Sequence, residues 1–129
     1  MNPTHNVVGW FEIPVADMKR AVSFYQTVFG YQLQHAPMGE LDMAWFPAVE
    51  GTEGSPGALA CHKDFYFPGN QGAIVYFTAF SGDLANELSK VPDAGGKVLM
   101  EKKLIADDIG YMGLFEDTEG NRIAIHSRR

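Results

Sequence analysis

The chain repeats one order of predicted elements. Apolar and polar residues alternate over residues 9–15, and apolar residues then recur at helical spacing over residues 17–29. A second alternating stretch begins at residue 73, and a second helical pattern covers residues 83–91. The first predicted helix can be capped by Asp17 and the second by Asp83 or Ser81, and glycine follows both. A repeat that covers most of the 129 residues predicts two structurally equivalent modules.

The two halves align at two closely related offsets. An offset of 64 positions pairs the strands and an offset of 66 pairs the helix boundaries, a difference that loops can absorb. The pairs at the offset of 64 are Val15 with Ala79, Trp10 with Ile74, Ala60 with Ala124 and His62 with His126. The pairs at the offset of 66 are Asp17 with Asp83 and Gly30 with Gly96.

Each half therefore reads as a strand, a helix and three further strands. The further strands are expected at residues 31–37, 41–47 and 57–62, and at residues 97–103, 111–117 and 122–127. A crossover helix makes the first two strands of a module parallel, and two hairpins then reverse the direction twice, so the first and fourth strands run the same way. We expect an α+β fold in one domain, with two tandem βαβββ modules at about residues 5–66 and 71–128. Helices should cover the outer face of a curved mixed sheet whose other face forms a cup.

Composition narrows the functional classes. Apolar residues make up 46% of the chain and charged residues 20%, which predicts a packed core. The net charge of −6 disfavours nucleic acid as a partner. Cys61 is the only cysteine, so no disulfide can form within the chain. No secretory signal and no apolar run long enough to span a bilayer are recognisable, so we expect a cytoplasmic protein without a membrane partner.

Two sequence runs resemble a known superfamily. They are PVADMKRAVSFYQTVFGYQL near the N-terminus and FEDTEGNRIAIHS near the C-terminus. Both resemble the glyoxalase/bleomycin-resistance/extradiol-dioxygenase superfamily, also called vicinal oxygen chelate proteins, in its first βα unit and in its closing hairpin. The resemblance implies paired βαβββ modules, a small-molecule ligand in the cup and, commonly, a homodimer. It is greatest to the glyoxalase-related branch, whose members mostly lack an assigned reaction.

The resemblance also implies where a metal would be bound, and this sequence departs from that pattern. Enzymes of the superfamily often hold a divalent metal with His, Glu or Gln on the first and fourth strands of the modules. The matching positions here are Trp10, Ala60, Ile74 and Ala124. None of these side chains can ligate a metal. We therefore expect no metal at the usual position, which argues against glyoxalase I or extradiol dioxygenase activity by the usual mechanism.

Four polar residues lie two positions further along the same strands: Glu12, His62, Tyr76 and His126. Alternation places them on the same sheet face as the missing ligands. Glu12 and His126 are the candidate catalytic residues, and we predict that they lie in one concavity. The candidate substrate-binding residues are Trp10, Trp45, His62, Ile74 and Tyr76. Solvated strand residues at Glu12 and His126, a surface His62 and a packed Tyr76 are the alternatives.

Three functions remain open. The first is a lyase or isomerase in which Glu12 abstracts a proton next to a carbonyl with His126 as its partner. The second is a non-catalytic protein that sequesters an aromatic or amphipathic molecule, as bleomycin-resistance relatives do. The third is a relocated divalent metal site made of His62, His126 and Glu12. The connector at residues 63–72 either folds over a pocket or packs as an apolar linker, which we favour. The sequence leaves open whether the cup forms within one chain or across a dimer.

Overall fold

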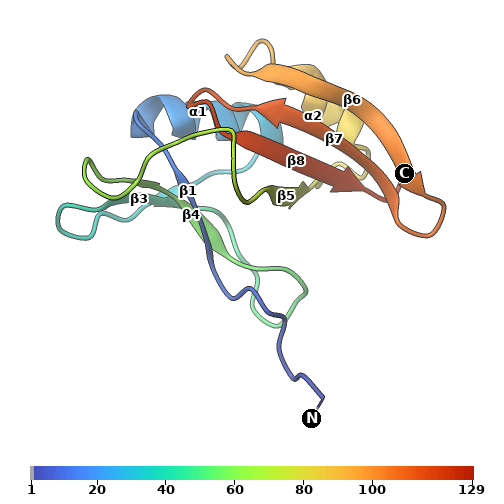
Figure 1. Ribbon diagram of the computed structural model, residues 1–129, viewed down its shortest axis with the longest axis horizontal. Coiled ribbons are helices and arrows are strands. Elements are labelled where there is room, and N and C mark those ends of the chain that lie inside the picture. The colour runs from blue at the N-terminus through green and yellow to red at the C-terminus, as the bar shows by residue number, and fades with distance from the viewer. Residues whose placement is uncertain (1) are drawn as a thin grey trace.

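The computed structural model describes residues 2–129 and contains two modules in tandem (Figure 1). The first module contains β1 (Phe11–Pro14), α1 (Met18–Phe29), β2 (Gln34–His35), β3 (Asp42–Trp45) and β4 (Gly57–Cys61). The second contains β5 (Val75–Thr78), α2 (Leu84–Lys90), β6 (Lys97–Ala106), β7 (Gly110–Glu116) and β8 (Arg122–Ser127). The predicted order of strand, helix and three strands is confirmed in both halves. Neither helix is long and apolar enough to cross a membrane, within the described residues.

Each module forms its own four-stranded mixed sheet. The strand orders are β1-β4-β3-β2 and β5-β8-β7-β6. The first and fourth strands of each module are parallel neighbours, and the remaining pairs are antiparallel. This is the topology that the crossover helix and two hairpins predict.

The strand register corrects one part of the predicted alignment. Glu12 lies opposite Ala58 in the first sheet, and Tyr76 lies opposite Ala124 in the second. The first strands therefore correspond at an offset of 64, whereas the fourth strands correspond at 66. Two extra residues of the second module lie between its first strand and its helix, because the helix caps Asp17 and Asp83 already differ by 66 positions. Ala58, and not Ala60, is thus the counterpart of Ala124.

The same correction shows that the predicted correspondence between His62 and His126 is wrong. The counterpart of His126 is Ala60, because the amide of Val15 bonds to the Ala60 oxygen as that of Ala79 bonds to the His126 oxygen. His62 follows β4 directly and has no equivalent place on β8. The absence of a donor side chain at the superfamily's ligand position is unaffected, since Ala58 cannot ligate a metal either.

Helix α1 begins and ends as predicted. The Asp17 carboxylate accepts a hydrogen bond of 3.1 Å from the Arg20 amide at its N-terminus. Gly30 follows the helix with φ of 80°, a left-handed conformation that glycine adopts without strain. Helix α2 is also capped by an aspartate, Asp83, but it ends at Lys90 and a turn separates it from Gly95.

One face of α1 packs against both sheets. Its Phe29 ring lies 4.9 Å from Phe77 of β5, and its Phe24 ring lies 5.7 Å from Phe115 of β7. Its Tyr25 ring lies 5.5 Å from Phe46, which follows β3 in the first module. Figure 1 shows α1 above β1 and β4, reaching the ends of β7 and β8. The two sheets thus share one core around α1, and we call the sheet faces that line it the inner faces.

The opposite faces, which we call the outer faces, point away from this shared core. Ile13 and Leu59 of the first sheet and Ile123 and Ile125 of the second lie in the core. Because side chains alternate along a strand, their sequence neighbours lie on the outer faces. The described chain therefore presents two outer faces that do not face each other.

The β7–β8 turn joins the two modules. The Glu119 carboxylate accepts hydrogen bonds from the amides of Ala16 and Asp17 at 2.9 and 2.8 Å. The guanidinium of Arg20 donates to both oxygens of the same carboxylate, at 2.7 and 2.9 Å. These donors fix the start of α1 against the second module.

Two further residues of this turn strengthen the junction. The Asn121 side chain donates to the Pro14 oxygen at 2.7 Å and accepts from the Gly69 amide at 3.0 Å. The buried hydroxyl of Tyr25 donates to Asp117 at 2.7 Å. Burial and the negative Asp117 carboxylate hold the pKa of Tyr25 well above its usual range. The sequence that resembles the superfamily's closing hairpin thus binds β1, α1 and the connector together.

Candidate ligand-binding site

The outer face of β1 carries a carboxylate held by two neutral donors. Glu12 is half-buried, opposite Ala58. Its Oε2 atom accepts a hydrogen bond of 3.1 Å from the indole Nε1 of Trp10. Its Oε1 atom accepts a hydrogen bond of 2.5 Å from the hydroxyl of Tyr66. Both oxygens are therefore fixed by the protein.

Tyr66 is the residue of this site that the sequence analysis did not assign. It lies in the connector, which folds back so that the Tyr66 amide bonds to the His62 oxygen at 3.2 Å. The hydrogen bond to Glu12, with smaller contributions from burial and from the negative charge, raises the pKa of Tyr66. The connector thus contributes to the site, instead of only packing as an apolar linker. The sequence signal that could have pointed to Tyr66 is the run of three aromatic residues at 65–67, shortly after β4.

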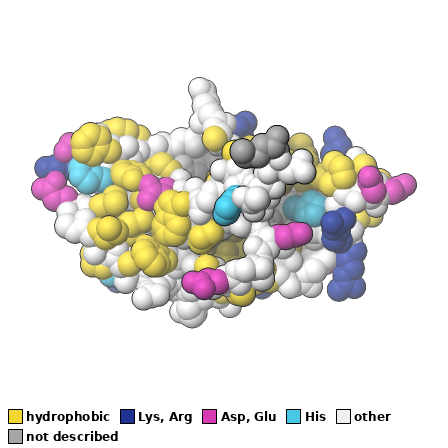
Figure 2. Space-filling view, turned by 90° about the horizontal axis from the view of Figure 1, so that it is seen from below, with side chains coloured by type: hydrophobic (Ala, Val, Ile, Leu, Met, Phe, Trp, Pro, Cys, Tyr) yellow, Lys and Arg dark blue, Asp and Glu magenta, His cyan; other side chains and the backbone are white. Residues whose placement is uncertain are grey.

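Two tryptophans form the apolar part of the same face. The rings of Trp10 and Trp45 lie 5.6 Å apart at an interplanar angle of 75°, an edge-to-face arrangement. Both tryptophans are 40% exposed, and Ala58, which lies opposite Glu12 on one side and Trp45 on the other, is fully buried. Figure 2 shows hydrophobic side chains gathered on this lower face, toward the side of the first module. We call Trp10, Glu12, Trp45 and Tyr66 the Glu12 site.

The outer face of the second sheet carries His126 and Tyr76. The His126 Nε2 atom lies 2.7 Å from the backbone oxygen of Ile109. Because a carbonyl oxygen only accepts, this Nε2 carries the hydrogen, which leaves Nδ1 as an acceptor in the neutral ring. Tyr76 is 51% exposed, and its hydroxyl is 3.8 Å from the sulfur of Met112. His126 lies on the neighbouring strand, opposite Thr78.

Glu12 and His126 have no contact with each other within the described chain. The hydrogen-bond partners of Glu12 belong to the first module and its connector, and the partner of His126 belongs to the second. The outer faces that carry them point away from one core. Their proposed pairing in one concavity therefore requires a second chain and stays a prediction.

His62 lies beside the connector and is mostly covered. Its ring is 5.0 Å from the Phe65 ring, and its Nδ1 atom accepts from the Asp64 amide at 3.1 Å. Its Nε2 atom is 3.7 Å from the exposed Glu40 carboxylate. The His62 side chain is 11% exposed, so it shapes the connector more than it presents a surface for a ligand.

No group of three or more His, Cys, Asp or Glu side chains in residues 2–129 is arranged to hold a metal ion. The proposed set of His62, His126 and Glu12 in particular is divided between the two outer faces. Cys61 is half-buried, as its inward position predicts, and its sulfur lies 3.8 Å from the Ala16 oxygen. Burial is the largest of the effects that raise the pKa of its thiol.

An apolar pocket of about 700 Å³ lies beside the free edge of β5. Ile74 and Tyr76 line it, as do Phe11, Phe46 and the loop at residues 47–57. Two of the predicted substrate-binding residues therefore lie at this pocket, whereas Trp10 and Trp45 lie at the Glu12 site.

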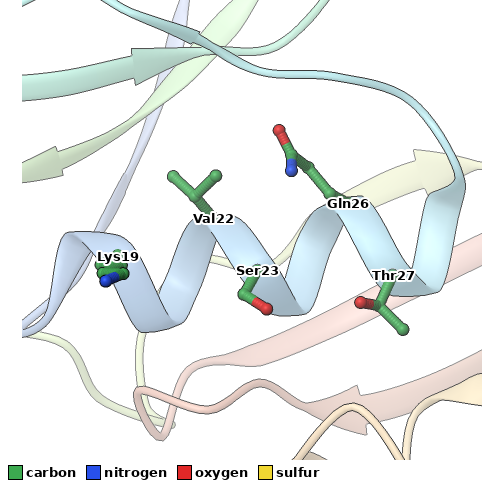
Figure 3. Close-up of a pocket in the computed structure, with 5 residues that line it drawn as sticks. All are labelled: Lys19, Val22, Ser23, Gln26 and Thr27. Carbon is green, nitrogen blue, oxygen red and sulfur yellow. The ribbon is translucent and has the colours of Figure 1, made fainter.

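A second hollow, of about 380 Å³, lies on the solvent-facing side of α1 (Figure 3). Its residues project from one helix face and are Lys19, Val22, Ser23, Gln26 and Thr27. Lys19 is the only ionisable side chain among them, so no acid–base pair or metal site is formed there. The hollow follows from the polar face of an amphipathic helix.

Comparison with known proteins supplies one family match and one full-length relative. A family model described as bleomycin resistance protein-like N-terminal matches residues 8–46. A glyoxylase-like domain-containing protein from Didymella fabae is 28% identical over 127 residues, which is 96% of this chain and 95% of that protein. The matched segment contains β1 and α1, which carry the first of the two sequence runs.

Solved structures share the fold. TnmS3, an antibiotic binding protein from Streptomyces sp. CB03234, is 21% identical with a TM-score of 0.68, over 98% of both chains. The V278E mutant of glyoxalase I from Zea mays is 14% identical with a TM-score of 0.68, over 93% of this chain. This chain spans 45% of the length of the maize enzyme. At these identities the likeness concerns the fold alone.

Proposed function

We propose that this chain, which has the fold of the glyoxalase/bleomycin-resistance/extradiol-dioxygenase superfamily, binds a small organic molecule at the Glu12 site. The observation that carries the proposal is an oriented carboxylate beside a pair of exposed indole rings. Ligand sites combine apolar walls with a few fixed polar groups, and Trp10, Trp45 and Glu12 supply both. The description of TnmS3 as an antibiotic binding protein agrees with binding as the function of such a face.

The binding needs no metal at the superfamily's usual position. The first-strand positions are Trp10 and Ile74, and the structurally corrected fourth-strand positions are Ala58 and Ala124. These side chains lack donor atoms suited to a divalent ion. In this proposal Glu12 acts by accepting hydrogen bonds from the ligand.

A second copy of the chain would complete the site. The outer face of the first sheet is open above Trp10 and Trp45, and that of the second sheet is open above Tyr76. A homodimer that sets the first outer face of one copy against the second outer face of the other would place these aromatic side chains on the walls of a shared cup. It would also bring Glu12 of one copy toward the partner's His126.

The binding test uses the fact that the chain contains two tryptophans, both in the Glu12 site. Their fluorescence therefore reports on this site, once the absorption and emission of each probe measured alone are subtracted. Titration with bleomycin and with the neutral aromatic probe N-phenyl-1-naphthylamine should change it saturably for at least one compound. The Trp45→Ala variant should weaken that binding, and Ala85→Ser on the exposed face of α2 should not. Unchanged fluorescence with both compounds up to their solubility limits would contradict the proposal.

A second candidate function is proton abstraction next to a carbonyl. It is favoured by the short hydrogen bond between Tyr66 and Glu12, which places a proton donor beside a carboxylate base. The reaction would use Glu12 of one copy with His126 of the other, as a lyase or isomerase. The protein should then exchange the carbon-bound hydrogens next to the carbonyl of hydroxyacetone for deuterium in D₂O, followed by NMR. Exchange that persists in Glu12→Gln would exclude Glu12 as the base.

A further inference from the structure

We infer that the Glu12 site recognises a planar group with two N–H donors, such as an amidinium or guanidinium, carried on a flat apolar body. This inference rests on the proposed function, because it names the ligand class of the same site. Three properties of the Glu12 site support it: its uncompensated charge, its free acceptor capacity and its exposed indole rings.

The charge of Glu12 has no cationic partner in residues 2–129. Its two hydrogen-bond donors, Trp10 and Tyr66, are neutral groups. Glu119, by comparison, has a cationic partner in Arg20. A half-buried carboxylate that has lost part of its water without gaining a counter-ion is destabilised. A bound cation would supply the missing partner.

The carboxylate retains acceptor capacity on both oxygens. An ionised carboxylate accepts at about four positions, and here each oxygen receives one bond from the protein. The bonds from Trp10 and Tyr66 also fix the plane of the group. A planar fork of two N–H donors matches two carboxylate oxygens in geometry, and charge makes these bonds stronger than neutral ones.

The indole rings favour a ligand whose planar N–H donor group is attached to a flat apolar part. Trp10 and Trp45 meet edge to face, and each residue remains 40% exposed. Delocalised cations and flat aromatic groups both bind favourably over an indole face. A neutral flat molecule would gain only the stacking, and an anion would meet the repulsion of Glu12 on a chain of net charge −6.

The test compares ligands that share one flat body. The probes are 2-naphthamidine, the neutral 2-naphthamide and the anionic 2-naphthoate, titrated into the full chain. Binding is followed by the NMR signals of the two indole N–H groups, which belong to Trp10 and Trp45. We expect the amidine to bind at least tenfold more tightly than the amide, about 1.4 kcal/mol, and the carboxylate to bind most weakly.

Variants assign the preference to Glu12. Glu12→Gln should lower the affinity for the amidine to that for the amide, whereas Asp93→Asn, an equal loss of charge at an exposed turn, should leave the preference intact. Tyr66→Phe also breaks the hydrogen bond between Tyr66 and Glu12 but keeps the carboxylate, so it should keep a preference for the amidine. It therefore tests the role of the charge in a second protein, should Glu12→Gln fail to fold.

The outcomes separate the two claims. Equal affinity for the amidine and the amide, with both indole signals shifting, would overturn the inference and leave the proposed binding function intact. Indole signals that stay unchanged with all three probes would count against both. A preference for the amidine that persists in Glu12→Gln would also overturn the inference.

Discussion

Glu119 carries its charge at the junction between the two modules, with its side chain fully buried. Burial alone would raise its pKa, and it is the largest single effect. The hydrogen bonds from Arg20, Asp17, Thr118 and Ala16 together outweigh it and lower the pKa to about 2. The folded state therefore holds the charged carboxylate more strongly than the unfolded state, in which the value is 4.5.

The sign of this shift predicts acid sensitivity. A lowered folded-state pKa stabilises the fold fully above pH 4.5, and the contribution is lost as the pH falls toward 2. The shift corresponds to about 3 kcal/mol, an upper value because Arg20 is half exposed and solvent screens the pair. We expect Glu119→Gln to lower the free energy of unfolding by about 1–3 kcal/mol at pH 7 and by less at pH 3. Urea denaturation at both pH values measures this.

Glu53→Gln is the matched control, because Glu53 lies in the exposed loop between β3 and β4. Its unfolding free energy should follow that of the wild type at both pH values. An equal loss at pH 7 and pH 3 in Glu119→Gln would show that packing, and not charge, is what Glu119 supplies.

The hydrogen bond between Tyr66 and Glu12 predicts a change in tyrosine ionisation. Because the bond raises the pKa of Tyr66, its phenol should ionise at higher pH than a free tyrosine. Removing the negative charge in Glu12→Gln should move this ionisation to lower pH. NMR titration of ring-carbon-labelled tyrosines follows all five, and the other four serve as internal controls. A Tyr66 titration that is the same in both proteins would contradict the contact.

The sequence predicted a functional role for only one of these residues, Glu12. Glu12 was identified because a carboxylate in an alternating strand stands out from its apolar neighbours. Tyr66 and Glu119 were not assigned a role, because both act through contacts between segments more than fifty positions apart. Periodicity describes the neighbours along a strand or helix, and it carries no information about such distant partners.

At the scale of elements, helices were predicted more closely than short strands. The caps at Asp17 and Gly30 are local signals and fixed α1 to within a residue. The strand expected at 31–37 shortens to β2, Gln34–His35, because Tyr31 packs against the core beside Phe29. Strand β6 extends to Ala106, beyond the expected 103, because its pairing with β7 continues through several irregularities of register.

A substitution at Gly96 can test how closely α1 approaches the second module. A Cβ atom at this position would lie 2.6 Å from the Glu116 backbone oxygen and 2.6 Å from the Phe24 ring. The backbone oxygen belongs to β7 and cannot move without breaking sheet pairing. We expect Gly96→Ala to lower the free energy of unfolding by about 1–3 kcal/mol in chemical denaturation.

Gly9→Ala is the control for this substitution, since a Cβ atom there would meet nothing within 4 Å. It should change the free energy of unfolding by no more than about 0.5 kcal/mol. A Gly96→Ala variant as stable as Gly9→Ala would mean that α1 lies further from β7 than the structure places it.

At the scale of the whole molecule, the internal repeat predicted the topology but not the arrangement of the modules. The sequence order and the helical crossovers determine which strands are neighbours within a sheet. The packing of α1 between two inner faces depends on side chains such as Phe24 and Phe77. Periodicity identifies these residues as apolar, but it does not show which other residues they contact. The choice between a cup within one chain and one across two chains could therefore not be made from the sequence.

The outward-facing aromatic side chains predict association. We expect light scattering at high micromolar concentration to give twice the chain mass of 14.2 kDa. Trp45→Lys places a charge on the outer face and should shift the protein toward the monomer. Ala85→Lys adds the same charge on the exposed face of α2 and should not. A wild-type protein of single-chain mass under these conditions would contradict the dimer.

The position of α1 also determines how the chain comes apart. Its rings complete the core of the second module, so opening the first module would expose Phe77 and Phe115 to water. The amides of β5 and β8 should then exchange with solvent hydrogen only in events that also release α1. We therefore expect a chain whose sequence is divided in two to melt as a single cooperative unit, in which neither half folds on its own.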